Sequence, residues 1–303
     1  MARVLIADSV AESAVQKMKD AGLELVLRDA NTDGPIEEQI KGFDGVVVRS
    51  ATKITREVIQ ASDKLKVVVR AGVGLDNVDA EAAKEKGILV MNTPEAPSVS
   101  VAEMVISMMF ALARNITQAD SLMKNERWEK KKLTGTELWQ KTLGIIGFGR
   151  IGQEVAKRGK ALEMDVLAYD VIDISEACKK YGARSSTIDE IISKADYITL
   201  HVPLIPQTKG MISTAEFDKM KTTAFLVNTA RGGVVDEEAL FIALEEGKIA
   251  GAALDVFENE PPTDWKLVKH SKLIATPHVA SSTNEAQDRV GDLTAQKIID
   301  AFK

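Results

Sequence analysis

The sequence is poor in cysteine and histidine, with one cysteine and three histidines among its 303 residues. A lone thiol, Cys178, excludes an intramolecular disulfide and a cysteine-rich zinc site. A long basic block is also missing and the net charge is -6, although a local basic pocket is compatible with this balance. We therefore expect neither a metal centre nor a nucleic-acid partner.

Long apolar runs are missing as well. The N-terminus MARVLIADSV has neither the basic region nor the sustained apolar run of a signal peptide, and no apolar stretch reaches membrane-spanning length. Together with the lone cysteine, this predicts a reducing, cytoplasmic location and no membrane partner. At 303 residues, with 45% apolar and 28% charged residues, the chain is expected to fold as two globular domains.

What the sequence does contain is a succession of short apolar runs, each ended by a polar residue and alternating with helical patterns. Near-continuous β-branched runs are typical of parallel strands covered on both faces of a sheet. A first series lies at residues 4–8, 25–27, 46–49, 67–70 and 88–92, and a second at 143–146, 166–169, 197–200, 225–227, 252–254 and 273–275. The sequence thus predicts an α/β protein with two doubly wound parallel sheets.

The boundary between the two domains is marked by TPEAP at residues 93–97, which breaks regular structure ahead of a helix over 99–114. No strand follows residues 273–275, and 284–303 reads as a helix that could return to the first domain. We therefore predict one domain of residues 1–97 plus 283–303, with 98–282 inserted into it.

The strongest motif is GFGRIG at residues 147–152, which matches the G-x-G-x-x-G of dinucleotide-binding turns. Alone it would be weak, because small-residue turns reach this pattern by chance. Here a strand precedes it, a helix and a second strand follow, and Asp170 stands at the end of that second strand. In this context a dinucleotide site is favoured over a purely structural glycine turn.

Each position of the motif has a physical task. Gly147 allows the tight turn, Gly149 lets the backbone approach a pyrophosphate, and Gly152 permits close helix packing. Arg150 and Ile151 supply amides at a positive helix N-terminus.

Asp170 indicates which dinucleotide binds. Its carboxylate can accept hydrogen bonds from a ribose diol and would repel a 2′-phosphate, and no arginine follows closely to compensate. NAD is therefore predicted over NADP.

A dinucleotide enzyme of this kind needs a proton-transfer group, and few histidines are available. His201 and His278 each follow an apolar run, and ligands of open α/β sheets bind beyond the carboxyl ends of strands. His270 lies in the polar stretch KHSK and is predicted to be a solvated surface residue.

An arginine in an unusual place points to an anionic ligand. Arg231 follows the apolar run 225–227 within VNTARGGVVD. An unpaired guanidinium at the end of a buried strand would cost several kcal/mol. We therefore expect an anion beside it, either a substrate or, as the weaker alternative, an internal carboxylate.

The chain resembles the D-isomer-specific 2-hydroxy acid dehydrogenases along its whole length. The segments that carry the resemblance are VVVRSATKIT, RAGVGLDNVD, ILVMNTP, WEKKKLTGTEL, GFGRIG, NTARGGVVDE, GAALDVFENEPP and TPH, in this order. The resemblance implies a Rossmann NAD-binding domain inserted into a flavodoxin-like substrate-binding domain. It also implies that Arg231, Glu260 and His278 are catalytic.

The same resemblance assigns the remaining binding residues. Asp255 would hold the nicotinamide end of the cofactor, with a turn cap as the less favoured alternative. Further cofactor contacts are implied at Val73, His201, Val202, Pro203, Thr229 and Ala230. Substrate contacts are implied at Arg49, Ser50, Arg70, Val73, Gly74, Arg231 and His278.

The substrate is predicted from two arginines that end strands of the first domain. Arg49 and Arg70 would suit a phosphate dianion. Together with a phosphate at this place, the resemblance implies oxidation of D-3-phosphoglycerate to 3-phosphohydroxypyruvate, the entry to L-serine synthesis. A glyoxylate or hydroxypyruvate reductase is the alternative enzyme, and an NAD-gated, corepressor-like binding protein is the alternative of another class.

The expected macromolecular partner is a second copy of the chain, bound through residues 99–140. Met104, Met108 and Met109 fit a dimer face on the helix over 99–114, and ordinary core packing explains them equally well. The lysines at 130–132 fit either a solvated face or a contact with the partner. The chain ends at Lys303 without the C-terminal regulatory domain of larger relatives. We expect it to be either a natural short form or a piece of a larger protein.

Overall fold

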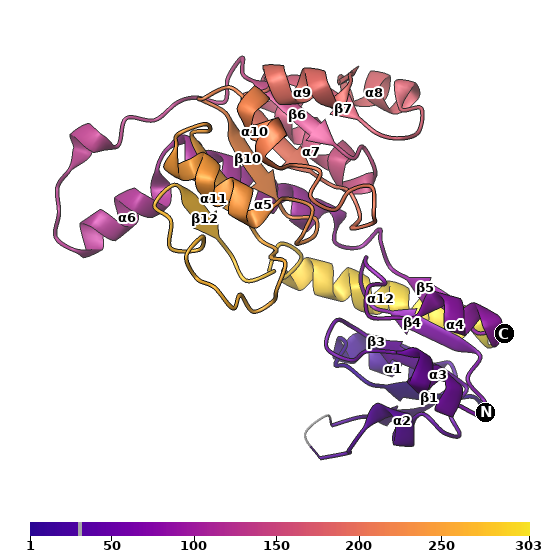
Figure 1. Cartoon of the computed structure of the whole chain (residues 1–303). Helices are drawn as coiled ribbons and strands as arrows, with labels where there is room; N and C mark the ends of the chain where they lie inside the picture. The colour runs from indigo at the N-terminus through magenta and orange to yellow at the C-terminus, as the bar shows by residue number, and fades with distance from the viewer. Residues whose placement is uncertain (30–31) are drawn as a thin grey trace. The chain divides into compact units, whose positions relative to one another are not determined.

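The computed structural model describes residues 1–29 and 32–303 and folds into two compact units (Figure 1). Unit 1 comprises Met1–Ser98 and Ser281–Lys303, and unit 2 comprises Val99–Ala280. The chain thus leaves unit 1 once and returns to it with its last helix.

Unit 1 contains a five-stranded parallel sheet with the order β2-β1-β3-β4-β5. The strands are β1 (Arg3–Ile6), β2 (Glu24–Leu27), β3 (Gly45–Val48), β4 (Val67–Arg70) and β5 (Leu89–Asn92). Val4 pairs with Leu25 on one side and with Gly45 on the other. The strand order reverses between β1 and β3, and such a reversal is where doubly wound sheets place their ligands.

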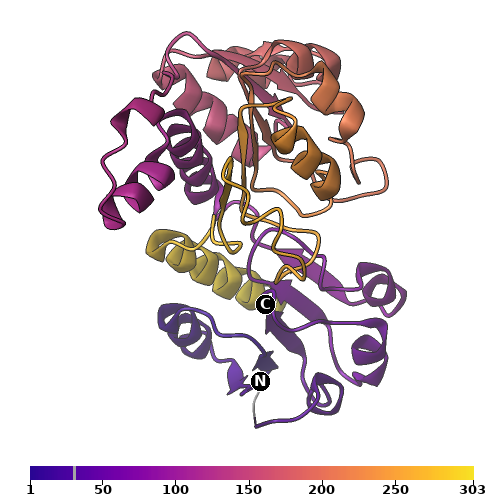
Figure 2. The ribbon, with the colours of Figure 1, turned by 60° about the vertical axis from the view of Figure 1, so that its left-hand side comes forward.

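Helices cover both faces of this sheet. The helices are α1 (Glu12–Asp20), α2 (Ile36–Gln39), α3 (Arg56–Ala61), α4 (Ala80–Glu85) and α12 (Asn284–Ala301). Met18 of α1 and Ile298 of α12 share one core layer, whereas Ile40, after α2, and Ile59 of α3 lie in the other. The C-terminal helix therefore completes the core of unit 1, where it packs on α1 (Figure 2).

Unit 2 contains a seven-stranded parallel sheet with the order β12-β11-β10-β9-β6-β7-β8. The strands are β6 (Thr142–Ile146), β7 (Asp165–Tyr169), β8 (Arg184–Ser185), β9 (Tyr197–Leu200), β10 (Phe225–Asn228), β11 (Gly251–Leu254) and β12 (Leu273–Ala275). The predicted fold class is confirmed. Only β8 escaped prediction, because its two residues are exposed and form no apolar run.

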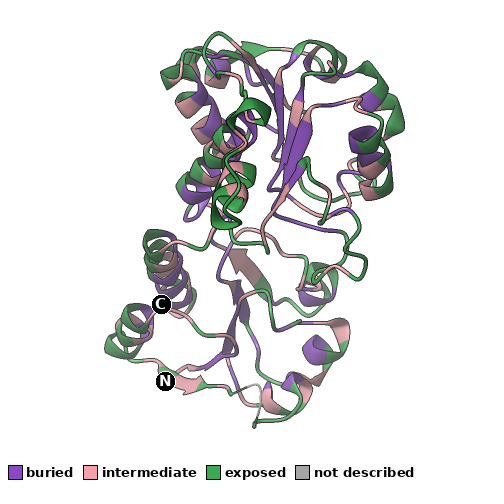
Figure 3. Ribbon diagram, turned by 90° about the vertical axis from the view of Figure 1, so that its left-hand side faces the viewer, coloured by how far each residue is buried: buried purple, intermediate pink, exposed green. Residues whose placement is uncertain are grey.

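The helices of unit 2 lie in two layers, and the central strands between them are buried (Figure 3). They are α5 (Ser98–Ala113), α6 (Ile116–Lys124), the 3-10 helix η1 (Lys130–Lys132), α7 (Arg150–Ala161), α8 (Ser175–Tyr181), α9 (Ile188–Lys194), α10 (Thr214–Lys219) and α11 (Glu237–Glu245). Apolar residues of α5, α7 and α8 form one core cluster, and those of α9, α10 and α11 form the other.

Of the three methionines predicted as part of a dimer face, two are core residues, and the third, Met104, is partly buried against the same cluster. Met108 and Met109 are buried in the cluster formed by α5, α7 and α8. Core packing, the equal alternative, is therefore correct for both. By contrast, α6 contains no buried residue and stands away from the sheet (Figure 1).

No single helix in the described ranges combines the length and apolarity needed to cross a membrane. Only α5 and α6 taken together meet both conditions, and they are bent by 63° at the break between them.

The tight packing of unit 2 yields a stability prediction at Gly144 on β6. A Cβ at this position would lie 2.4 Å from Cγ2 of Ile191, a buried residue of α9. Gly144→Ala should therefore lower the free energy of unfolding by about 1–3 kcal/mol, as overpacked cores do. Urea denaturation measures this, with Gly149→Ala as the control, because no heavy atom lies within 4 Å of that added Cβ. Equal stability of the two variants would show that the core at Gly144 is loose.

Candidate functional site

The glycine turn after β6 is shaped by packing at two of its three glycines. Gly147 has a φ of 94°, and a Cβ there would lie 2.4 Å from the carbonyl oxygen of His201. A Cβ on Gly152 would lie 2.3 Å from the carbonyl oxygen of Gly147. No atom lies within 4 Å of the corresponding position on Gly149. The turn is thus rigid, with open space at the N-terminus of α7 where a pyrophosphate could approach.

Asp170, at the end of β7, is bonded directly to this turn. Its carboxylate accepts hydrogen bonds from the N–H groups of Phe148 and Val171, each at 2.7 Å. One oxygen accepts each bond, so both retain capacity for a ribose diol. The sequence did not indicate this anchoring of the glycine turn. Val171 and Ile172, which directly follow Asp170, are exposed apolar residues. The sequence analysis did not single them out.

Two predicted cofactor residues present buried polar atoms without a hydrogen-bond partner among the described residues. These atoms are Nδ1 of His201, after β9, and Oγ1 of Thr229, after β10. The other ring nitrogen of His201 lies 3.1 Å from Oγ1 of Thr199. Burial lowers the pKa of His201 to about 3, so the imidazole is neutral near pH 7. Unsatisfied buried groups are costly, and a ligand rich in hydroxyl and amide groups would satisfy them.

His278 lies in a turn after β12 and has a left-handed backbone, with a φ of 54°. Such a backbone is uncommon outside glycine and persists only where surrounding contacts hold it. The N–H of His278 donates to the carbonyl oxygens of Asp255, at 2.8 Å, and Thr276, at 3.1 Å. These bonds fix the backbone that carries the His278 ring beyond the carboxyl end of β12.

The carboxylate of Asp255 fixes the same turn through hydrogen bonds to its backbone. Asp255 is fully buried and accepts hydrogen bonds from the N–H groups of Val279, at 2.9 Å, and Ala280, at 2.8 Å. The hydroxyl of Thr276 donates to it as well. Asp255 is therefore a turn cap, the alternative that the sequence analysis favoured less. Its contact with nicotinamide stays a prediction.

The His278 ring is paired with Glu260, which follows β11. Nδ1 of His278 and Oε2 of Glu260 are 2.7 Å apart, and Oε1 accepts from the N–H of Phe257 at 3.1 Å. The His278 side chain is 48% exposed and that of Glu260 is 38% exposed. Since Nδ1 is engaged by the carboxylate, Nε2 is the nitrogen left for proton exchange with a ligand.

The turn that carries Arg231 lies directly against the loop that carries Glu260. A Cβ on Gly232 would lie 1.8 Å from the carbonyl oxygen of Phe257, so only glycine permits this approach. Asn228, at the end of β10, shapes the turn: its side chain donates to the Arg231 carbonyl and accepts from the N–H of Ala230, both at 3.0 Å. Unit 2 thus brings the turn of Arg231 to the loop that carries Glu260. The sequence did not single out Asn228.

His270 is not the solvated residue that the sequence predicted. Its side chain is only 7% exposed, and Nε2 lies 3.0 Å from Oε1 of Glu245. Its ring packs edge-on against Phe241. The polar neighbours in the sequence misled the prediction, because the partners of His270 come from α11.

In unit 1, the predicted substrate residue Arg49 lies in a clamped loop at the reversal of strand order. Asp8, after β1, accepts hydrogen bonds from the N–H groups of Arg49, at 2.6 Å, and Thr52, at 3.1 Å. The side chain of Asn77 donates to the carbonyl oxygens of the same two residues, at 2.7 and 2.6 Å. Within the described part of the chain, no ion pair engages the Arg49 guanidinium. Sequence reasoning missed both clamping residues, and the exposed Ser50 lies between the clamped positions.

The predicted substrate residues Val73 and Gly74 lie in the loop that follows β4. The guanidinium of Arg70 lies across Gly72, where a Cβ would be 1.6 Å from Nη1. Asn92 donates its side-chain amide to the Val73 carbonyl at 2.5 Å, which holds the loop against the end of β5. Among the described residues, the N–H groups of Val73 and Gly74 donate no hydrogen bond. They can therefore bind an anion.

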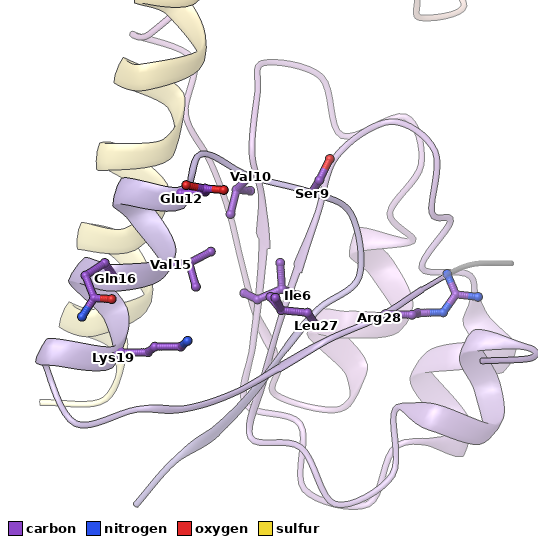
Figure 4. Close-up of a pocket in the computed structure, with 9 residues that line it drawn as sticks. All are labelled: Ile6, Ser9, Val10, Glu12, Val15, Gln16, Lys19, Leu27 and Arg28. Carbon is purple, nitrogen blue, oxygen red and sulfur yellow. The ribbon is translucent and has the colours of Figure 1, made fainter. Parts of the chain in front are cut away.

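Two surface cavities lie apart from these residues. One of about 330 Å³ lies in unit 1 between the side chains of α1 and those of β2, lined by residues such as Lys19 and Leu27 (Figure 4). Another of about 400 Å³ in unit 2 is lined by residues such as Lys160 and Arg184. Neither includes a predicted site residue. In residues 1–29 and 32–303, no group of three or more His, Cys, Asp or Glu side chains is arranged to hold a metal ion.

Comparison with known proteins identifies relatives along the whole chain. Residues 106–280 match the family described as D-isomer specific 2-hydroxyacid dehydrogenase, NAD binding domain. The chain is 48% identical over 299 residues to D-3-phosphoglycerate dehydrogenase of Methanocaldococcus jannaschii, and 46% identical over 301 residues to that of Homo sapiens. These matches cover 98% and 99% of this chain. They cover only 57% and 56% of the relatives, so the chain spans little more than half their length.

Solved structures resemble the fold over nearly its full length. A glyoxylate reductase from Paecilomyes thermophila gives a TM-score of 0.91 at 29% identity and covers 100% of this chain and 95% of its own. D-lactate dehydrogenase from Aquifex aeolicus, complexed with NAD and lactic acid, gives 0.86 at 33% identity and covers 99% and 95%.

The capping contacts of Asp255 generate a stability prediction. Asp255→Asn keeps the side-chain shape but replaces an acceptor oxygen by an N–H₂ donor, which would face donors of the turn. The free energy of unfolding should fall by about 1.5–3 kcal/mol, as for lost hydrogen bonds to a charged group. Urea denaturation measures this, with Asp173→Asn as the control, because Asp173 is exposed and its carboxylate, among the described residues, accepts hydrogen bonds from the nearby Ser175 alone. Unchanged stability of Asp255→Asn would refute the capping role.

Proposed function

The chain belongs to the D-isomer specific 2-hydroxyacid dehydrogenase family, and on this premise we propose that it oxidises D-3-phosphoglycerate to 3-phosphohydroxypyruvate. The cofactor is NAD, because the matched region is the NAD-binding domain of the family. The observation that carries the proposal is the His278–Glu260 pair, at 2.7 Å, beside the turn of Arg231. In a cell this reaction would open the synthesis of L-serine.

The acid–base pair would exchange the proton of the reacting hydroxyl. A bound NAD would supply the hydride acceptor for C2 of the hydroxy acid. Nε2 of His278 takes the hydroxyl proton while Glu260, on Nδ1, fixes the ring and stabilises the imidazolium that forms. In the direction of reduction, the same imidazolium returns the proton to the carbonyl oxygen.

The NAD itself would be held by residues at the carboxyl ends of the unit 2 strands. The open position at Gly149 and the amides of Arg150 and Ile151 suit the pyrophosphate, and Asp170 suits the ribose diol. The remaining proposed contacts are Val73, Gly147, Gly152, His201, Val202, Pro203, Thr229, Ala230 and Asp255. The unpaired buried atoms of His201 and Thr229 support this assignment.

Anion-binding groups would orient the substrate. Arg231 binds the carboxylate and polarises the reacting oxygen, and the free amides of Val73 and Gly74 add to carboxylate binding. Arg49, with Ser50 and Arg70, would bind the phosphate. The clamp of Asp8 and Asn77 supports this role, because it holds the Arg49 backbone without neutralising the guanidinium.

We further propose that the protein forms a homodimer through residues 99–140. Large apolar side chains are exposed on and around α6, which contributes no residue to the core. They are Phe110, Ile116, Met123, Trp128 and Trp139. Several large apolar residues exposed within one segment of the chain support an interaction site there, and a second copy would cover them. The cytoplasmic location remains a prediction from the sequence.

The acid–base pair is tested by substitution. His278→Ala should lower kcat for reduction of 3-phosphohydroxypyruvate by about 10²–10⁴-fold, the usual contribution of a positioned acid–base group. NADH affinity, measured by fluorescence titration, should stay nearly unchanged. In Glu260→Gln the imidazolium loses its anionic partner. As the pH is raised, the reduction of 3-phosphohydroxypyruvate should therefore be lost at a lower pH than in the unmodified protein. An identical pH profile in that variant would remove Glu260 from the mechanism.

The phosphate assignment is tested by comparing two keto acids that differ only in the phosphate. Arg49→Ala should lower kcat/KM for 3-phosphohydroxypyruvate by about tenfold to a hundredfold, the worth of one charged hydrogen bond, and spare hydroxypyruvate. Arg56→Ala is the matched control, since that arginine is paired with Glu85 in the same unit. NADH absorbance gives both rates.

If the unmodified protein reduces hydroxypyruvate or glyoxylate as efficiently as the phosphorylated acid, the phosphate site is wrong. A glyoxylate or hydroxypyruvate reductase would then be the better assignment. The similarity to the glyoxylate reductase from Paecilomyes thermophila, at a TM-score of 0.91, makes this the alternative to test.

A further inference from the structure

We propose that Glu237 is a positioning residue that holds Glu260 against His278 by binding the backbone of the loop between Phe257 and Glu260. This inference rests on the proposed function, because Glu237 would act through the acid–base pair. Its structural part can be tested without any enzymatic activity.

Glu237 connects the helix α11 to the loop that carries Glu260. It is the first residue of α11, and its Oε1 accepts a hydrogen bond from the N–H of Glu258 at 2.5 Å. The preceding N–H in the loop, that of Phe257, donates to Glu260 itself. Two successive loop amides are thus bound by two carboxylates, one inside the loop and one outside it. Glu237 is the external contact that fixes the loop to the rest of unit 2.

A second contact holds the loop from the other side. The carbonyl of Phe257 lies against Gly232, so closely that a Cβ there would be 1.8 Å from its oxygen. Gly232 and Glu237 belong to one segment, which begins at Arg231 and enters α11. This segment contacts the loop at Gly232 and again at Glu237. The two contacts fix the position of Glu260 relative to the turn of Arg231. Loss of the Glu237 contact would leave the N–H of Glu258 without its acceptor on α11.

The choice of a carboxylate at this position is costly, which argues that the hydrogen bond matters. Burial, together with the charges of Glu258 and Glu260, raises the pKa of Glu237 above its ordinary value. A neutral glutamine would accept from the same N–H without this cost. A charged acceptor, however, forms a shorter bond about twice as strong as a neutral one. A carboxylate in an unfavourable electrostatic environment is typical of sites where function requires it.

The neighbouring side chains give Glu237 no cationic partner that would explain its charge. Asp236 caps α11 and accepts from Ser213, and Glu238 points instead toward Lys266, at 3.9 Å. Within the described ranges, no ion pair involves Glu237 itself. The contact that remains for its carboxylate is the amide of Glu258.

The kinetic test is a double-mutant cycle. Glu237→Ala should lower kcat by roughly tenfold, with KM for NADH unchanged, because the proton-transfer pair is misplaced but the cofactor residues are not. Glu237→Gln, which keeps a weaker, neutral acceptor, should recover part of this loss. In a Glu260→Gln background the same Glu237→Ala change should cost nothing further, since residues that act as one unit are non-additive. Glu238→Ala is the matched control and should retain full activity.

The cycle separates positioning from a merely structural role. If Glu237→Ala lowers kcat equally with and without Glu260, or if Glu237→Gln is as impaired as Glu237→Ala, the inference is overturned. Urea denaturation of each variant establishes that the compared proteins are folded.

Amide hydrogen exchange tests the positioning without turnover. Glu237→Ala should accelerate exchange in a peptide spanning residues 256–262 by tenfold or more, and Glu238→Ala should not. This outcome is expected even if the unmodified protein reduces no phosphorylated keto acid, which would refute the proposed function alone. Unchanged exchange in Glu237→Ala would refute the positioning role whatever the substrate is.

Discussion

The geometry of the proposed active site depends on one buried carboxylate, that of Asp255. Its oxygens accept hydrogen bonds from the turn after β12, and its carbonyl accepts the N–H of His278. These bonds hold His278 in a left-handed conformation that few residues adopt. Because Asp255 itself follows β11, the ring that would transfer the proton is fixed to the sheet through a neighbouring strand as well as through its own.

The other site residues of unit 2 are organised around the same edge of the sheet. Arg231, Glu260 and His278 follow β10, β11 and β12, which are adjacent in the sheet. Gly232 permits the Arg231 turn to touch the Glu260 loop, and Glu260 in turn engages His278. A rigid parallel sheet thus brings together three residues that are distant in sequence. In the proposed reaction, their fixed arrangement would remove much of the entropic cost of orienting catalytic groups.

The sequence predicts the sheets well because a strand covered on both faces must be apolar at nearly every position. The sequence also predicts the glycine turn, where packing leaves no room for a Cβ on Gly147 or Gly152. By contrast, β8 consists of two exposed residues and has no apolar pattern. His270 is buried by contacts with α11, which the residues next to it in the sequence do not indicate. Asp8, Asn77 and Asn228 escaped notice because they bind backbone groups of loops, whose course the sequence does not reveal.

The central claim is that Nε2 of His278 exchanges the proton of the substrate hydroxyl while Nδ1 is held by Glu260. A crystal structure of the complex with NAD and D-3-phosphoglycerate tests it most directly. The account predicts the C2 hydroxyl oxygen at about 2.6–3.2 Å from Nε2, the reach of a hydrogen bond. It also predicts that Glu260 remains bound to Nδ1. A bound substrate whose hydroxyl contacts a different side chain, with Nε2 of His278 turned away from it, would contradict the account.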